Sequence, residues 1–129
     1  DVNTINTNNE QRDTHLKSAD FFDAENHPKM IFESKSIKKT SDSEMQVTGN
    51  LTLRGVTKEI TLDVIYNGTV SGFGDSTITG FEVRGKINRF DYGLKWNALT
   101  EAGGVVVSNE VKIEILAEFN KVNEAIKAA

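Results

Sequence analysis

Alternation of apolar and polar residues recurs along most of the chain, and it restricts the fold more than any other feature. In MQVTGNLTLR, residues 45–54, the apolar side chains Met45, Val47, Leu51 and Leu53 share one parity, and polar residues take most of the other. The segment KEITLDVIY, residues 58–66, repeats the pattern. Because successive side chains of a β-strand point to opposite faces, a period of two predicts strands with one apolar and one solvated face. This pattern is typical of antiparallel sheets joined by short turns.

Further strands are predicted near residues 29–38, from a glycine-rich loop at 68–76 to about Phe90, and from about residue 105 to 120. Residues 1–7 alternate weakly and suggest the end of a strand, which gives about six strands in all. The two longest strands run about 15 residues, or roughly 50 Å at about 3.3 Å per residue, so they must bend. Gly80 and Gly85 are the expected kink points. The final segment KVNEAIKAA is expected to be a tail or a short helix.

Two glycine positions are expected to serve turns or bulges and not ligand contacts. Gly55 joins two alternating segments within RGVT, and Gly103-Gly104 lies in a predicted loop over residues 91–104. Glycine adopts positive φ without a steric penalty, which tight turns require.

One helical insert interrupts the strand pattern. Thr7-x-x-Glu10 has the spacing of a capping box, which predicts a helix from near Asn8. Pro28 disfavours helix at the preceding residue and marks the exit. Leu16, Ala19 and Phe22 are spaced as one inward-facing stripe. Phe21 and Phe22 cannot both face inward on a regular helix, so a break is expected within residues 18–20.

The composition excludes several classes of protein. A chain of 129 residues is expected to form one domain, residues 1–129. Its net charge of -4 gives no basic surface for nucleic acid. The absence of cysteine excludes disulfides and thiolate chemistry. No apolar run is long enough for a transmembrane helix.

The polar residues give no pattern typical of an enzyme or a metal site. His15 and His27 lack metal-ligand spacing, and His15 beside Arg12 and Asp13 is expected to be a structural hydrogen-bonding residue. The acidic residues at positions 20, 23 and 25 suggest a solvated turn more than an acid–base pair. Arg89 and Asp91 are expected to pair across a loop. We therefore expect no catalysis and no metal.

Three stretches together resemble the YceI-like family. They are QRDTHLKSADFFDAENHPKMIF, GNLTLRGVTKEITL and INRFDYGLKWNALTEAGGVVVSNEVKI. Members of this family are bacterial polyisoprenoid-binding proteins with a lipocalin-like β-barrel. The resemblance implies an all-β antiparallel barrel of eight strands with a short helical insert. About two of those strands would precede the position of Asp1. The resemblance leaves the compartment open between periplasm and cytoplasm.

The resemblance implies non-enzymatic binding of a long apolar lipid, a polyisoprenoid or an isoprenoid quinone, with no other cofactor. The helical insert would then lie at one mouth of the barrel. The expected ligand-binding residues are Leu16, Phe21, Phe22, Met30, Phe32, Leu51, Leu53, Leu62, Val64, Phe81, Val83, Trp96, Ile113 and Ile115. Eight of them, on successive strands, are expected to point into the barrel. Trp96 is expected either to cap the barrel or to contact ligand.

Two alternatives remain open from the sequence. The apolar faces suit a filled barrel that serves as a protein-interaction or structural module, which is the common arrangement in small barrels. An unpaired sheet edge would attract either the N-terminal strands of the family or a second copy of the chain.

Overall fold

The computed structural model describes residues 1–98 and 102–121, which form one antiparallel sheet with short helical segments. The strands are β1 (Ile31–Lys39), β2 (Glu44–Leu53), β3 (Val56–Ser71), β4 (Thr77–Asn88) and β5 (Glu110–Lys121). Each strand pairs with its neighbours in sequence, in the order β1-β2-β3-β4-β5. The helical segments are η1 (Val2–Thr4), α1 (Glu10–Lys17) and η2 (Arg89–Tyr92).

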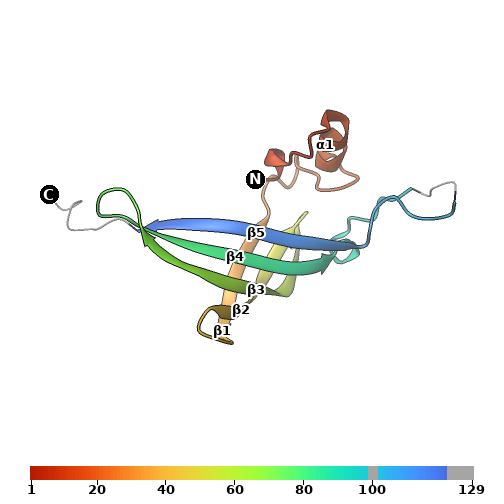
Figure 1. Ribbon diagram of the computed structural model, residues 1–129. Helices are drawn as coiled ribbons and strands as arrows, with labels where there is room; N and C mark the ends of the chain where they lie inside the picture. The colour runs from red at the N-terminus through yellow and green to blue at the C-terminus, as the bar shows by residue number, and fades with distance from the viewer. Residues whose placement is uncertain (99–101, 122–129) are drawn as a thin grey trace.

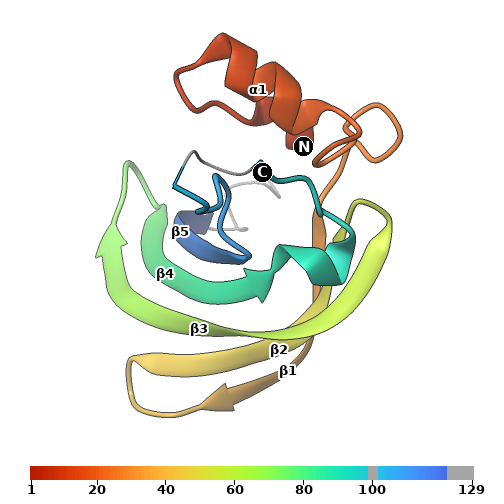
Figure 2. The same cartoon turned by 90° about the vertical axis from the view of Figure 1, so that its right-hand side faces the viewer.

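The sheet curves into a trough, and α1 lies over its open side (Figures 1 and 2). We call the concave surface the inner face and the convex surface the outer face. Along β3, Leu62 and Val64 are buried, whereas the alternate residues Thr61 and Asp63 are exposed. The predicted parity of this strand is therefore confirmed, and its apolar side chains lie on the inner face.

The hairpin between β2 and β3 turns on two residues, Arg54 and Gly55. Leu53 and Val56 are register partners, and the two central residues have φ of 51° and 74°. Two positive φ values are the requirement of a type I′ turn, whose twist matches that of the flanking strands. The prediction of a tight turn at Gly55 is confirmed.

The turn between β3 and β4 is shorter than predicted. β3 continues to Ser71, so the expected loop over residues 68–76 is reduced to residues 72–76. The irregularity in β3 is a bulge between Tyr66 and Gly68, while the β4–β5 register stays regular through Gly80 and Gly85. The bulge lies opposite Phe81 and Gly80, and the expected kinks at these two β4 glycines stay a prediction.

The N-terminal segment differs from the prediction. Residues 2–4 form a 3₁₀ turn and no strand, so the described residues contain five strands where about six were expected. The helix begins at Glu10 and its N-cap is Asn9, whose side chain accepts a hydrogen bond from Arg12 N. The Thr7 hydroxyl instead donates to Asp13, and this bond lowers the pKa of the Asp13 carboxyl.

The helical insert breaks where expected, but its inward face is different. α1 ends at Lys17, and Ser18 is its C-cap. Beyond this break Phe21 is buried, Phe22 is half-buried and Ala19 is exposed. The predicted stripe through Ala19 was wrong because the helix ends two residues before it.

The C-terminal part also begins later than predicted. β5 starts at Glu110, because residues 105–109 belong to the connection after η2. Gly103 lies in a bend with φ of 82°, as expected of a turn residue. Lys121 ends β5, and the rest of the predicted tail lies outside the described residues.

Candidate functional site

The inner face carries rows of apolar side chains that cross neighbouring strands. Met45, Val64, Val83 and Ile115 are successive register partners from β2 to β5. On β4 and β5 the inner-face positions are Thr77, Thr79, Phe81, Val83, Gly85, Ile87, Val111, Ile113, Ile115, Ala117, Phe119 and Lys121, of which only Lys121, the last residue of β5, is charged. The trough therefore presents an apolar surface along the strand direction.

Gly85 allows the strands to fit closely in the middle of this surface. A Cβ at position 85 would lie 2.5 Å from Leu62 Cδ2, closer than real carbon contacts allow. Because Gly85 has no side chain, Leu62 occupies the space above it. At this point the side chain of a β3 residue therefore covers the inner face of β4.

The end of the trough farthest from the helical insert is lined by aromatic rings. Tyr66 and Phe81 have ring centroids 5.7 Å apart, as do Phe81 and Phe119. The Tyr66 hydroxyl is hydrogen-bonded to Thr69, whose hydroxyl meets that of Thr79 at 2.9 Å. Phe119 is 60% exposed, so this end of the surface is open.

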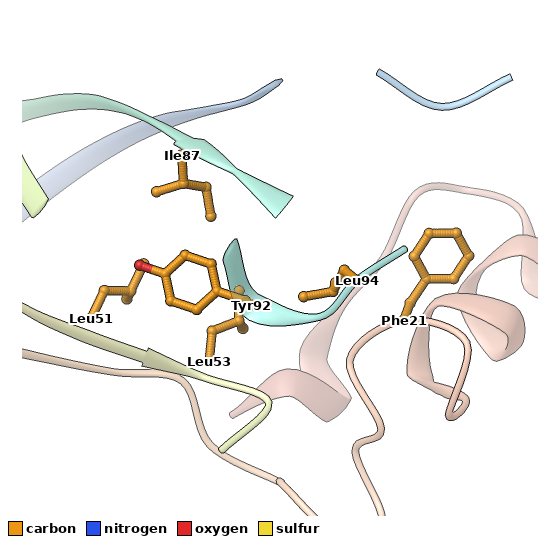
Figure 3. Packing of buried hydrophobic residues seen from close by; sticks show 6 residues of the cluster. All are labelled: Phe21, Leu51, Leu53, Ile87, Tyr92 and Leu94. Carbon is orange, nitrogen blue, oxygen red and sulfur yellow. The ribbon is translucent and has the colours of Figure 1, made fainter. Parts of the chain in front are cut away.

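The opposite end is closed by a packed cluster that we call the plug. It consists of Phe21, Leu51, Leu53, Ile87, Tyr92 and Leu94, all at most 8% exposed (Figure 3). Leu16, Phe22, Phe32, Trp96 and Ile113 are among the half-buried residues packed against it. Side chains from the helical insert, from strands β1, β2, β4 and β5, and from η2 and the residues after it therefore meet at one place.

Arg54 ties the β2–β3 turn to the two segments that cover the plug. Its Nη1 donates to Gly93 O at 3.0 Å, and its Nη2 donates to Ala19 O at 2.6 Å. A non-glycine residue with positive φ costs roughly 1–2 kcal/mol. These two charge-assisted bonds offset that strain.

Arg89 holds the connection between β4 and β5 from within. It is 2% exposed, and its guanidinium donates to Ser108 O at 2.9 Å, Leu94 O at 2.6 Å and Trp96 O at 2.7 Å. Asp91 is exposed, and no ion pair joins it to Arg89 within the described part of the chain. The predicted pairing of these two residues was wrong, because the Arg89 guanidinium donates its hydrogen bonds to main-chain carbonyls instead.

A cavity of about 500 Å³ lies on the far side of the plug from the trough, between α1 and the connection after η2. We call it the mouth pocket. Its lining is Asn9, Gln11, Arg12, His15, Leu16, Phe21, Trp96, Val106 and Val107. The structure thus brings together Leu16, Phe21 and Trp96, three predicted ligand-binding residues from distant parts of the sequence.

His15 organises one wall of the mouth pocket. Its ring meets Trp96 and Phe21 edge-on, with centroids 4.7 and 5.1 Å apart, and its Nε2 lies 2.8 Å from Asp20 Oδ2. The expected structural role of His15 agrees with these contacts, although the partner is Asp20 and not Arg12 or Asp13. Trp96 is half-buried against the plug and also lines the pocket, which fits either role expected of it.

The predicted residues divide into groups. Leu51, Leu53 and Phe21 belong to the plug, while Leu62 and Val64 are buried farther along the inner face. The half-buried members are Leu16, Phe22, Phe32, Phe81, Val83, Trp96 and Ile113. Ile115 is 44% exposed on the edge strand, and Met30 is 52% exposed before β1 begins. Met30 is therefore not brought into either the plug or the mouth pocket.

Sequence reasoning missed Tyr92, Leu94 and Arg54. Tyr92 is 1% exposed, and its hydroxyl has no hydrogen-bond partner among the described residues. Burial, and secondarily the charge of Asp91, raises the pKa of the Tyr92 phenol. Tyr92 and Leu94 lie in the stretch that was expected to be a loop, so no strand alternation pointed to their burial.

The described residues do not form a metal centre. Within residues 1–98 and 102–121, no three His, Asp or Glu side chains gather closely enough to hold a metal ion. No helix in that same part of the chain is long and apolar enough to cross a membrane.

The fold and its landmarks match a known family. The family model described as the YceI-like domain matches residues 1–119. The chain belongs to the YceI-like family. UPF0312 proteins of Staphylococcus aureus strains N315 and MSSA476 are each 46% identical to it over 118 residues. The match covers 91% of this YceI-like chain and 66% of each relative, so the chain spans about two thirds of their length.

Solved structures place the curved sheet in the same fold class. The Campylobacter jejuni YCEI protein superposes with a TM-score of 0.82 at 32% identity, covering 95% of this chain and 69% of that one. Burkholderia cenocepacia BcnA superposes with a TM-score of 0.74 at 22% identity, covering 92% and 70%, and shares the fold. The YceI neighbours have a lipocalin-like barrel, which confirms the predicted fold class.

Proposed function

We propose that this YceI-like chain binds a long apolar lipid along its inner face, without catalysing a reaction. The lipid would be a polyisoprenoid or an isoprenoid quinone, held for carriage, storage or stress protection. The observation that carries the proposal is the inner face of β4 and β5, which is uncharged from the plug to Thr79 and Phe119 at the open aromatic end. At about 3.3 Å per residue, the 12 residues of β4 span roughly 40 Å, a length suited to a chain and not to a compact ligand.

Burial of the lipid chain would supply the affinity. Each CH₂ removed from water contributes about 0.8 kcal/mol, before the costs of association are subtracted. Exposed apolar surface on the inner face, such as Ile115 and Phe119, would be buried in the same step. Such a site would select for length and apolarity more than for the chemistry of the chain end.

The function is tested by placing a charge on the inner face. Leu62→Arg is expected to abolish co-purification of lipid, because an unpaired charge in an apolar site is expensive. Thr61→Arg puts the same charge on the exposed outer face one residue away and is the matched control. Organic extracts of both variants and the wild type would be compared by mass spectrometry, with circular dichroism to verify folding.

Val83→Lys gives a second variant at a half-buried position, in case Leu62→Arg does not fold. Lipid retained in a folded inner-face variant would contradict binding on this surface. Extracts of the wild type without lipid would instead support the rival function, a filled barrel that serves as an interaction or structural module. The tight plug is the observation that favours this rival.

A further inference from the structure

The Tyr92 hydroxyl is a polar atom within an apolar cluster. Its ring packs among Leu51, Leu53 and Ile87, and its oxygen lies beside Leu51, on the side of the ring away from Phe21 (Figure 3). The oxygen is buried, and no hydrogen-bond partner lies near it in the part of the chain that the structure describes. It is thus directed away from the helical insert and toward the sheet.

An unpaired buried hydroxyl is unfavourable for folding. Leaving such a group unsatisfied costs about 1–3 kcal/mol, and most buried polar side-chain atoms in proteins have a partner. A phenylalanine at position 92 would supply the same ring without that cost. The hydroxyl therefore calls for an explanation beyond packing.

We infer that Tyr92 Oη is the anchor for an oxygen-bearing end of the bound lipid. This assignment rests on the proposed function and deepens it: the ligand is an apolar chain that ends in a carbonyl or another acceptor oxygen. The polar end lies against the plug, and the tail extends along the inner face toward Phe81 and Phe119. For a ligand atom to reach the oxygen, the leucine side chains beside it would have to shift.

The chemistry of the group suits this role. A protonated phenol donates one hydrogen bond, and burial keeps Tyr92 protonated by raising its pKa. Hydrogen bonds formed away from water face little competition from solvent. Other hydroxyls on the inner face are those of Tyr66 and Thr69 on β3 and Thr79 on β4. Those hydroxyls already bond to one another.

The test compares two lipids and two tyrosine variants. Geranylgeranylacetone, an isoprenoid ketone, and its counterpart with CH₂ in place of the carbonyl would compete with a bound fluorescent apolar probe. Wild type is expected to prefer the ketone, and Tyr92→Phe to lose about 3- to 10-fold of that preference, the range that one net hydrogen bond supplies. Tyr66→Phe removes the other tyrosine hydroxyl of the chain and is expected to leave the preference unchanged.

Stability gives a second measurement. Without ligand, Tyr92→Phe is expected to melt at the same temperature as wild type or higher, because it removes an unpaired polar atom. A lower melting temperature would show that the hydroxyl already has a partner and would overturn the anchor. An unchanged ketone preference in Tyr92→Phe, or a preference lost only in Tyr66→Phe, would also overturn it. Wild type that binds neither lipid would instead overturn the proposed function itself.

Discussion

Arg89 is a buried cation whose hydrogen bonds go to the main chain. Three carbonyl oxygens accept from it at 2.6–2.9 Å, and the Phe90 ring centroid lies 4.9 Å from its Cζ. Each of those carbonyls belongs to the connection between η2 and β5. The residue therefore stabilises a segment that has little regular structure of its own.

We expect Arg89→Met to lower the free energy of unfolding by about 3 kcal/mol, since it leaves several buried carbonyls without a donor. Arg84→Met on the preceding strand, β4, replaces an exposed arginine and is expected to change stability by at most about 0.5 kcal/mol. Urea denaturation followed by circular dichroism measures both. Equal effects of the two variants would show that the carbonyl contacts of Arg89 contribute nothing.

The face of the sheet to which each strand residue points was predictable from the sequence, because burial selects apolar side chains at every second position. Leu62 and Val64 were placed correctly for this reason. The partners of Arg89 were not predictable, because a main-chain carbonyl leaves no trace in the sequence. Tyr92 was missed because sequence alone does not show whether a hydroxyl is paired.

The β2–β3 hairpin depends on Gly55 for two separate reasons. Its φ of 74° disfavours any side chain, and a Cβ there would lie 2.7 Å from His27 Cε1. Gly68 has a φ of 107°, but a Cβ at that position would meet no atom within 4 Å. A side chain at position 55 would therefore meet both backbone strain and steric overlap, whereas one at position 68 would meet the strain alone.

We expect Gly55→Ala to destabilise the protein by about 2 kcal/mol and Gly68→Ala by about 1 kcal/mol, since only the first adds an overlap to the strain. Thermal and urea unfolding measure the difference. Combining Gly55→Ala with His27→Ala should recover the part due to overlap. If the two alanine variants are equally stable, His27 does not restrict the turn.

Some elements were predicted well and others poorly. The hairpin at Gly55 was predictable because two alternating segments leave room for only a short turn. The end of β3 was wrong because glycine was taken as a strand terminator at Gly68, whereas the sheet accommodates it in a bulge. The helix start predicted from the capping box was wrong because Asn9, and not Thr7, is the N-cap residue.

The sheet as a whole has two edges within the described residues, since β1 and β5 each pair with one neighbour. On β5, Ile115 and Phe119 on the inner face and Leu116 on the outer face are exposed. Edges of this kind are templates for pairing with another strand. The general fold was predictable from alternation, but the strand count of eight implied by the resemblance stays a prediction.

We expect the isolated 129-residue chain to self-associate through these edges. Light scattering after size exclusion should give a mass above 14.3 kDa that rises with concentration. Hydrogen exchange should then show β5 amides gaining protection in the associated form. A mass of 14.3 kDa at every concentration would contradict the expectation. It would show that the charged side chains on the edge strands are enough to prevent pairing with another chain.

The two arginines that frame the plug have a consequence for variation among related chains. Arg54 and Arg89 donate hydrogen bonds to main-chain carbonyl oxygens, which belong to Ala19, Gly93, Leu94, Trp96 and Ser108. A carbonyl is present whatever side chain a residue carries. Side chains around the mouth pocket are therefore free to change while the frame keeps its shape. Such a frame would allow new ligand preferences to arise, or to be engineered, by substitutions that leave the architecture intact.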